Sequence, residues 1–264
     1  MYDYHMHSDF SDDGFVSMEK MIESAICKDI LEIAVTDHYD PDYADPEFPF
    51  EINFKEYHHK LIEVEKKYHK KIKVLKGIEI GIQDGATLLK CETAVTAFPY
   101  DFVLGSFHCA YGQALYVQYF QKRTAENGIA DFYIYMLDCL MSYQNFDVLG
   151  HFNVIDRYVD YIPDYAPYME HIEAILKILV QNGKGIEFNT SSFRYGMGNR
   201  TTPSKEILSL YKNLGGEIIT IGSDAHKPDD VGANYKDAVE IIKSHGFRYL
   251  STFENRKIKF IPLD

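Results

Sequence analysis

Short apolar segments alternate with longer amphipathic ones along almost the whole chain, and this alternation constrains the fold more than any other feature. Strands that alternate with helices predict a parallel sheet with crossover helices. Seven strands favour a closed or nearly closed barrel, so we expect an α/β fold, a distorted (β/α)7 barrel. The expected strands cover residues 2–7, 32–36, 72–80, 101–107, 147–150, 185–189 and 217–221.

Helices are expected between these strands and after the last one, from their apolar spacing and their cap residues. Ser17 is a candidate N-cap for the first of them. Two stretches, 40–50 and 111–127, read as loops beside the strand ends, and a last strand is expected near 257–262. The expected helices cover residues 17–28, 54–69, 88–97, 129–143, 168–181, 205–214 and 236–245.

Nearly every expected strand ends on a histidine or a carboxylate. In a parallel βα barrel the C-terminal ends of all strands open onto one face, so groups far apart in sequence meet there. We therefore expect a multinuclear metal site at the C-terminal ends of the strands. The groups at these ends are His5, His7, Asp37, His38, Glu79, His108, His151, Glu187, Asp224 and His226.

The spacing within these groups also suits metal binding. His5 and His7 are two residues apart, so a strand places both imidazoles on one face, and the same holds for Asp224 and His226. Glu79 could bridge two cations through its two oxygens. The other five of the eleven histidines fall in expected helices, where a solvated surface role is the expectation: His58, His59, His69, His171 and His245.

Composition limits the organisation and the partners of the chain. No composition break or repeat divides the 264 residues, so we expect a single domain spanning 1–264. The net charge of −13 argues against nucleic acid or an anionic membrane as partner, because both are bound mainly through clustered Lys and Arg. A small molecule is the expected partner, and the sequence leaves the oligomeric state open.

The sequence also carries an expectation about location. The N-terminus has no basic segment followed by an apolar one, so we expect no secretory signal. No apolar run approaches the roughly 20 residues that are needed to cross a bilayer. The four cysteines have no Cys-x-x-Cys spacing and are expected to stay reduced. We expect a cytoplasmic protein.

As a set, the strand-end motifs resemble those of the PHP (polymerase and histidinol phosphatase) superfamily, and among its branches the histidinol-phosphate phosphatases. The resemblance spans nearly the whole chain, and the set is highly specific although each motif alone is weak. Its motifs are His5-Met6-His7-Ser8, Ser11-Asp12-Asp13-Gly14, Thr36-Asp37-His38, Gly77-Ile78-Glu79, Gly105-Ser106-Phe107-His108, Gly150-His151 and Gly222-Ser223-Asp224-Ala225-His226.

The resemblance implies two or three divalent metal ions, and the ligand types suit Zn, Mn and Fe alike. Many relatives have a histidine where this chain has Asp13, and the adjacent Asp12 could fill that role instead. The implied ligands are His5, His7, Glu79 and Asp224 for the first ion, Glu79, His108 and His151 for the second, and Asp13, His38 and His226 for the third.

The activity implied by the resemblance is hydrolysis of L-histidinol phosphate to L-histidinol and phosphate, a late step of histidine biosynthesis. A hydroxide bridging the first two ions would be the nucleophile, since coordination lowers the pKa of water from about 15.7 to near 7. Glu79, Asp224 and His226 are the candidate catalytic residues because they would hold the reacting ions.

Two arginines are candidates for binding the phosphate. Arg157 and Arg194 lie in expected loops on the strand-end side, and arginine can hold a phosphate with two hydrogen bonds and a permanent charge. The alternative for each is a surface salt bridge. Weaker candidates are Cys109 as a nucleophile, Asp37 as a residue that either orients a ligand or is structural, Glu187 and Asn189 as residues that orient ligands or contact substrate, and Arg200 as a further phosphate ligand.

Three other functions remain open from the sequence. The first is a PHP-type phosphatase for another small phosphomonoester or for phosphotyrosine. The second is an amidohydrolase-like enzyme, although such barrels commonly bridge their metals with a carboxylated lysine and the strand ends here carry none. The third is a module that binds metal or a partner without turnover, although the implied ligand set is intact.

Overall fold

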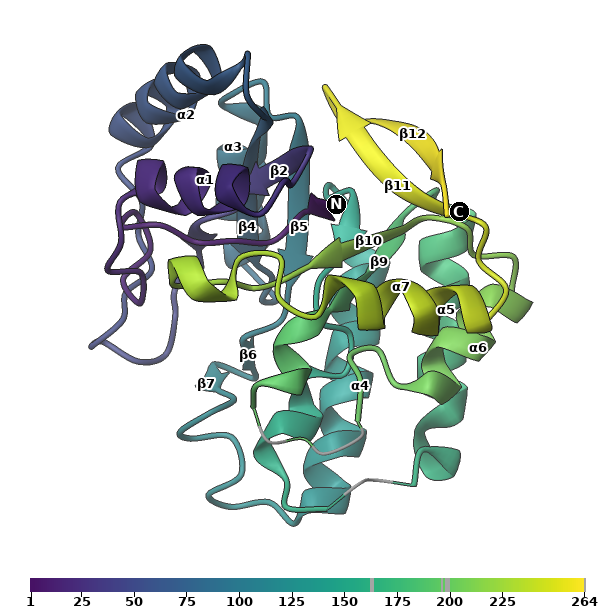
Figure 1. Ribbon diagram of the computed structural model, residues 1–264. Helices are drawn as coiled ribbons and strands as arrows, with labels where there is room; N and C mark the ends of the chain where they lie inside the picture. The colour runs from purple at the N-terminus through teal and green to yellow at the C-terminus, as the bar shows by residue number, and fades with distance from the viewer. Residues whose placement is uncertain (162–163, 196, 198–199, 264) are drawn as a thin grey trace.

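A parallel sheet forms the centre of the molecule in the computed structural model, which describes residues 1–161, 164–195, 197 and 200–263 (Figure 1). A short strand, β3 (His38–Tyr39), continues β2 (Glu32–Val35), and both pair with β4 (Lys73–Gly81), so the two occupy one place in the sheet. In spatial order the strands are β1 (Tyr2–Asp3), β2 (Glu32–Val35), β4 (Lys73–Gly81), β5 (Phe102–Ser106), β8 (Val148–Leu149), β9 (Gly185–Asn189) and β10 (Ile219–Gly222).

The two edges of this sheet meet and close it. The backbone N–H of Tyr4 donates to the carbonyl of Ile221 at 2.9 Å, and the N–H of Asp224 donates to the carbonyl of His5 at 2.7 Å. Farther along, the N–H of His7 donates to Ala225 at 2.9 Å. We call this junction of residues 4–7 with residues 221–225 the barrel seam. The expectation of a seven-stranded distorted barrel is confirmed.

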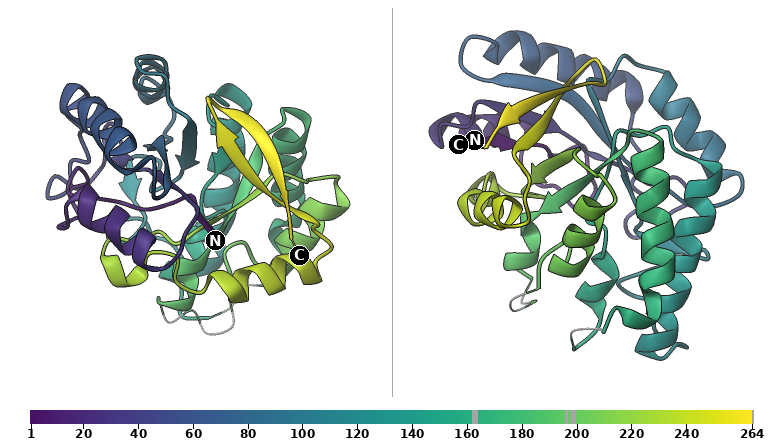
Figure 2. Two further views of the ribbon diagram at one scale, coloured as in Figure 1. Left: turned by 45° about the horizontal axis from the view of Figure 1, so that its top comes forward. Right: turned by 90° about the vertical axis from the view of Figure 1, so that its right-hand side faces the viewer.

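Helices cover the outside of the barrel (Figure 2). In α2 (Phe54–Tyr68), the buried residues Tyr57, Leu61, Val64 and Tyr68 recur at helical spacing, so one face packs on the sheet. Ser17 occupies the N-cap of α1, but its side chain makes no capping hydrogen bond. The helices are α1 (Met18–Cys27), α2 (Phe54–Tyr68), α3 (Thr87–Thr96), α4 (Ala125–Ser142), α5 (Met169–Gln181), α6 (Lys205–Asn213) and α7 (Tyr235–Ser244).

An antiparallel hairpin of β11 (Tyr249–Glu254) and β12 (Lys257–Pro262) covers the N-terminal end of the barrel, at the top of Figure 1. Only its second strand was expected from the sequence. Phe253 of the hairpin packs inside the barrel end, and its N–H donates to the Tyr4 hydroxyl at 2.8 Å. We call this end the barrel floor, defined by Tyr4, Ala34, Leu75, Phe102, Leu104, Val148 and Phe253.

The opposite end, the barrel mouth, is formed by the C-terminal strand ends and the loops that follow them. The loop after β3 meets the loop after β7, where the Tyr116 hydroxyl donates to the Asp45 carboxylate. Helix α4 begins at Ala125, capped by Thr124, so the second loop is shorter than expected. No helix in the described ranges has the length and hydropathy needed to cross a membrane. The short elements are β6 (Cys109–Ala110), β7 (Gln113–Ala114) and the 3-10 helices η1 (Val154–Tyr158), η2 (Ala166–Tyr168), η3 (Thr190–Phe193) and η4 (Pro228–Asp230).

Candidate metal centre

The first group of candidate donors lies across the barrel seam. The Nε2 atoms of His5 and His7 are 3.0 Å apart, as the spacing of the two residues predicts for one face. From Oε2 of Glu79 they lie 3.1 and 3.5 Å away, respectively. From Oδ1 of Asp224 the corresponding distances are 3.7 and 3.4 Å. Four side chains from β4 and the two sides of the seam thus converge on one point.

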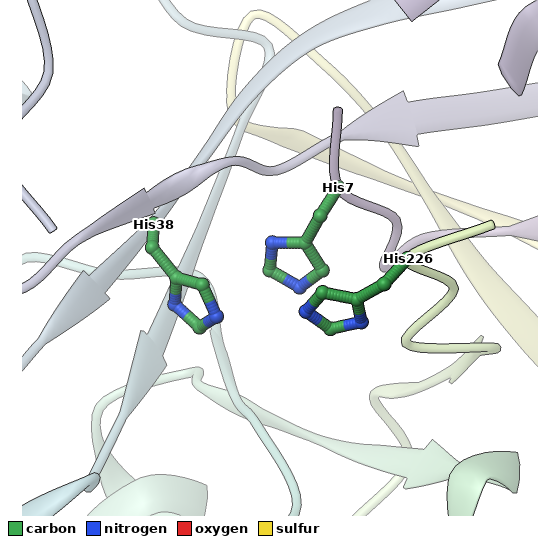
Figure 3. Close-up of side chains that lie close together, drawn as sticks. All are labelled: His7, His38 and His226. Atoms are coloured by element: carbon green, nitrogen blue, oxygen red, sulfur yellow. The ribbon is translucent and has the colours of Figure 1, made fainter. Parts of the chain in front are cut away.

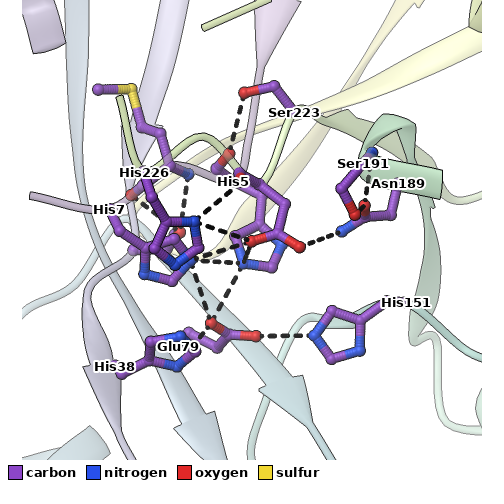
Figure 4. A network of polar contacts seen from close by, with 12 residues as sticks. His5, His7, His38, Glu79, His151, Asn189, Ser191, Ser223 and His226 are labelled. Carbon is purple, nitrogen blue, oxygen red and sulfur yellow. Dashed lines mark hydrogen bonds and ion pairs between the residues drawn. The ribbon is translucent and has the colours of Figure 1, made fainter. Parts of the chain in front are cut away.

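The second group is built around the other oxygen of Glu79. Oε1 of Glu79 lies 3.4 Å from Nε2 of His108 and 3.1 Å from Nε2 of His151, and these two nitrogens are 3.2 Å apart. Figure 4 shows the Glu79 carboxylate between His151 on one side and His5 and His7, which follow β1, on the other. Glu79 therefore presents one oxygen to each group, which is the geometry expected of a bridging carboxylate.

The third group lies nearer to solvent. His38 and His226 come from different elements, and their rings flank His7, each with a centroid distance of 4.2 Å (Figure 3). Oδ2 of Asp13 lies 3.0 Å from Nε2 of His226 and 3.7 Å from Nε2 of His38. The neighbouring Asp12 instead accepts a hydrogen bond from the backbone N–H of Phe50 at 2.6 Å. Of the two aspartates, Asp13 is the one that faces the cluster.

The separations between donors fit divalent cations. Bonds of about 2.0–2.1 Å place neighbouring donors of a tetrahedral ion roughly 3.3 Å apart, which is close to the distances in all three groups. Two buried polar atoms here, Asp13 Oδ1 and His151 Nδ1, have no hydrogen-bond partner among the described residues. Such an arrangement is costly for a site meant to remain without ligands.

Charge in the cluster alternates between carboxylates and imidazoles. Burial alone would raise the pKa of Glu79, but the imidazoles around it, led by that of His5, hold it well below its ordinary value. Burial lowers the pKa of His38, but the carboxylates of Glu79 and Asp13 raise it to about 9 overall. Burial and the neighbouring imidazoles lower the pKa of His7 to about 3. His7 is therefore neutral, with a lone pair free to bind a cation.

Asp40 supports two of the candidate donors and was missed by sequence reasoning. Its carboxylate lies 2.7 Å from Nδ1 of His108 and 3.2 Å from Nδ1 of His38. A carboxylate on the far nitrogen fixes the orientation and tautomer of a metal-binding histidine. Gly81 leaves room for it, because a Cβ there would come within 1.7 Å of Asp40 Oδ1. The available signal was its position two residues after His38, directly after the short strand β3.

Glu187, like Asp40, supports candidate metal-binding histidines from the side away from the cluster. Its Oε1 lies 2.7 Å from Nδ1 of His5, and its Oε2 accepts from the backbone N–H of His151 at 2.8 Å. The side chain is fully buried and lies outside the cavity lining. Of the two roles left open by the sequence, the orientation of candidate ligands is the one its contacts support.

A cavity of about 390 Å³ opens directly above the cluster. The base of the cavity contains candidate donors from all three groups, and its walls are mostly aromatic. A volume in this range suits a small organic ligand. The lining residues are Asp13, His38, Tyr43, Phe48, Phe50, His108, Tyr116, His151, Val154, Arg157, Tyr158, Tyr195, Asp224 and His226.

The two candidate arginines have different surroundings. Arg157 lines the cavity, and one of its terminal nitrogens lies 3.8 Å from Oδ2 of Asp224. Arg194 lines an adjoining hollow and donates to the carbonyl oxygens of Ser223 at 2.7 Å and Asp224 at 3.1 Å. Its Nε lies 3.4 Å from a carboxylate oxygen of Asp230. Both lie beside the cluster, but only Arg157 lines the main cavity.

The weaker candidates have structural partners. Arg200 donates to the backbone carbonyl oxygens of Met197 and Asp156 and does not line the cavity. Burial raises the pKa of the Cys109 thiol to about 12, so the thiol is protonated and a poor nucleophile. Asp37 accepts from the backbone N–H and the hydroxyl of Ser8, which fixes the loop leading to Asp13.

Comparison with known proteins gives one consistent result. A model of the PHP domain matches residues 3–191. A protein of Clostridium acetobutylicum named "Probable histidinol-phosphatase" is 32% identical, over 98% of this chain and 99% of its own. The histidinol-phosphatase of Lactococcus lactis is 29% identical, over 97% of this chain and 95% of its own.

Solved structures show the same similarity in three dimensions. The histidinol phosphate phosphatase of Lactococcus lactis, complexed with Zn, L-histidinol and phosphate, superposes with a TM-score of 0.88 at 29% identity, over 98% of both chains. A protein of Listeria monocytogenes shares the fold with a TM-score of 0.74 at 20% identity, over 90% of this chain and 99% of its own. With the matched family model, these similarities show that this chain belongs to the PHP domain family.

Proposed function

We propose that this protein is a metal-dependent phosphomonoesterase that hydrolyses L-histidinol phosphate to L-histidinol and phosphate. The observation that carries the proposal is the position of Glu79, with one oxygen toward each of two donor groups beneath a cavity lined by Arg157. Full-length similarity to a phosphatase solved with Zn, L-histidinol and phosphate supports the choice of substrate.

Nine side chains would hold two or three divalent ions such as Zn, Mn or Fe. We assign His5, His7, Glu79 and Asp224 to the first ion, Glu79, His108 and His151 to the second, and Asp13, His38 and His226 to the third. The distances within each group support this assignment. Bound ions of this kind activate water and offset the charge of a phosphate group. Glu79, Asp224 and His226 are the proposed catalytic residues among them.

The remaining residues would bind and orient the substrate. Arg157 offers a permanent positive charge and parallel N–H donors to phosphate oxygens, and Arg194 adds positive charge from the adjoining hollow. The aromatic wall, which includes Tyr43 and Phe50, can pack against a flat imidazole ring and keep water away from the reacting ester.

The test is phosphate release by purified protein from L-histidinol phosphate and from a panel that includes other small phosphomonoesters and phosphotyrosine. Bound metals are counted on the same sample. Strong preference for histidinol phosphate with two or three metals per chain is the expected result. Metal-replete protein that prefers another ester would retain the phosphatase mechanism and reject the substrate, and inactivity on every ester would favour a non-catalytic module.

Two further features belong to this proposal. We infer that residues 1–264 act as one domain, because strands on both sides of residue 191, where the family match ends, share one sheet. We also infer a cytoplasmic location. The four cysteines, Cys27, Cys91, Cys109 and Cys139, are all free thiols, as expected for a reducing compartment.

A further inference from the structure

Asn189 links the candidate metal centre to the arginine in the cavity. It ends β9, is fully buried, and uses both ends of its side-chain amide. Its Nδ2 donates to Oε2 of Glu187 at 3.0 Å and lies 3.5 Å from Oδ2 of Asp224. Its Oδ1 accepts from the backbone N–H of Ser191 at 3.0 Å and from the Ser191 hydroxyl at 2.5 Å. Figure 4 shows Asn189 and Ser191 side by side at the edge of the cluster.

The two carboxylates determine the direction of each hydrogen bond in this chain. An ionised carboxylate only accepts, so the amide nitrogen of Asn189 must face Glu187 and Asp224, and its oxygen must face Ser191. The hydroxyl proton of Ser191 is then directed toward Asn189. A lone pair on the hydroxyl oxygen is left for a donor, and a terminal nitrogen of Arg157 lies 3.0 Å away.

Two contacts hold the guanidinium group of Arg157, one at its edge and one on its flat face. Ser191 accepts from its NH2 nitrogen, and the ring of Tyr195 lies under the guanidinium with 4.0 Å to the ring centroid. The arginine side chain is only 20% exposed, its NH2 nitrogen also lies 3.8 Å from Oδ2 of Asp224, and its buried Nε has no hydrogen-bond partner among the described residues. These contacts orient the guanidinium at the wall of the cavity.

We propose that Ser191, oriented by Asn189, is a positioning residue that fixes the guanidinium of Arg157 for phosphate binding. The inference rests on the proposed phosphatase function and deepens it, because it names the residues that set the geometry of the phosphate site. A hydrogen bond to a charged group contributes enough for its loss to change binding by about 10-fold or more.

The structure supplies a matched control in the next residue. Ser192 lies in the same 3-10 helix, is 1% exposed, and donates from its hydroxyl to the backbone carbonyl of Asn189 at 3.2 Å. Unlike Ser191, it has no hydrogen bond to Arg157. Ser191→Ala and Ser192→Ala therefore remove the same buried hydroxyl group from neighbouring positions, and only the first removes the acceptor for the arginine.

The experiment measures KM and kcat for L-histidinol phosphate, inhibition by inorganic phosphate, and metal content, all on the full metal-loaded chain. We expect Ser191→Ala to weaken both substrate and phosphate binding by about 10-fold with unchanged metal content. Ser192→Ala should stay within about 2-fold of wild type. In an Arg157→Ala background, Ser191→Ala should add less than about 2-fold, since its effect passes through Arg157.

Each contrary result rejects the inference. Unchanged phosphate binding in Ser191→Ala would show that the arginine needs no such acceptor. An equal effect in the Arg157→Ala background, or loss of metal, would show that Ser191 acts on the fold or on the metal centre instead. If wild-type protein fails to hydrolyse histidinol phosphate, the proposed function fails separately. The same cycle is then measured by calorimetry with inorganic phosphate, and absence of phosphate binding would also reject the role of Ser191.

Discussion

The two ends of the barrel are built from the same strands but have opposite chemistry. Strand β4 carries Leu75 at the barrel floor and Glu79 at the mouth, and β5 carries Phe102 at the floor and leads to His108. At the floor, aromatic rings pack edge to face, as Tyr4 and Phe102 do with centroids 5.0 Å apart. At the mouth, buried nitrogen and oxygen atoms face one another, and two of them, Asp13 Oδ1 and His151 Nδ1, have no hydrogen-bond partner in the part of the chain that the structure describes.

This difference shows that the two ends of each strand contribute to different properties, stability at the floor and function at the mouth. Apolar packing at the floor stabilises the barrel, because it removes apolar surface from water and leaves few buried polar groups to satisfy. Clustered carboxylates and imidazoles at the mouth are costly to bury, and that cost is tolerated where the groups have a function. The predictions below test whether the two ends can be altered independently.

The largest effect is expected from Glu79→Ala at the mouth. It removes the carboxylate that faces two donor groups, so we expect loss of bound metal and a fall in kcat/KM of about 10³-fold or more. Metal analysis and steady-state kinetics on the same preparation measure this. A Glu79→Ala protein with full metal content and full activity would defeat the ligand assignment.

The second effect is expected at the floor, from Phe253→Ala. Removing this buried ring from the hairpin should lower the free energy of unfolding by about 3–5 kcal/mol. Urea denaturation measures the loss. At temperatures well below the unfolding midpoint, metal content and kcat should match wild type. A parallel loss of metal would mean that the two ends are coupled.

The third prediction separates substrate binding from metal binding at the mouth. Arg157→Ala should lower kcat/KM by about 10²–10³-fold, because it removes a charged donor from the cavity, while metal content stays unchanged. Arg194→Ala should have a smaller effect, since Arg194 lies in the adjoining hollow and already donates to the carbonyl of Ser223. Unchanged kinetics in both variants would place phosphate binding elsewhere.

The smallest effect concerns Asp156, a buried carboxyl near the mouth with neutral partners in place of imidazoles. Burial raises its pKa from 3.8 to about 6, although hydrogen bonds from Tyr165 and Asn153 oppose the shift. The folded state then binds the proton more tightly than the unfolded state. Its stabilising contribution is complete below about pH 4 and is lost as the pH rises through 6, a change of roughly 2–3 kcal/mol.

The measurement for Asp156 is the difference in unfolding free energy between wild type and Asp156→Asn, followed from pH 4 to pH 7. The unfolding free energy of wild type should fall relative to that of Asp156→Asn as the pH rises, because asparagine cannot ionise. A difference that does not depend on pH would show that Asp156 has an ordinary pKa in the folded protein.

Much of the architecture could be predicted from the sequence, because it follows from local patterns. Strand and helix positions follow from the spacing of apolar residues, and the C-terminal strand ends of a parallel barrel necessarily share one face. For that reason nine residues far apart in sequence could be expected to meet, and the structure brings them together. The choice between Asp12 and Asp13 could not be made, because the direction of each side chain depends on how the loop folds.

Other features depend on tertiary contacts that local patterns do not encode. β11 lies outside the barrel sheet and pairs only with β12, in antiparallel orientation, so the rule that places the parallel barrel strands does not place it. Asp40 and Ser191 act through hydrogen bonds to residues distant in sequence, His108 and Arg157 respectively. Arg200 is the opposite case, a residue that the sequence offers as a phosphate ligand. In the structure its guanidinium donates to backbone carbonyl oxygens instead.

The barrel seam has a consequence for how the chain folds. Asp3 accepts a hydrogen bond from Ser223, 220 positions away, so the last pairing of the barrel has a very high contact order and cannot form early. Under the proposed assignment His5 and His7 lie on one side of the seam, and Asp224 lies on the other. An ion shared by them would act as a removable crosslink that closes a loop of about 220 residues, worth roughly 5 kcal/mol in the chain-entropy description of disulfides. The cation that serves catalysis would then also set how long the closed barrel persists before it opens.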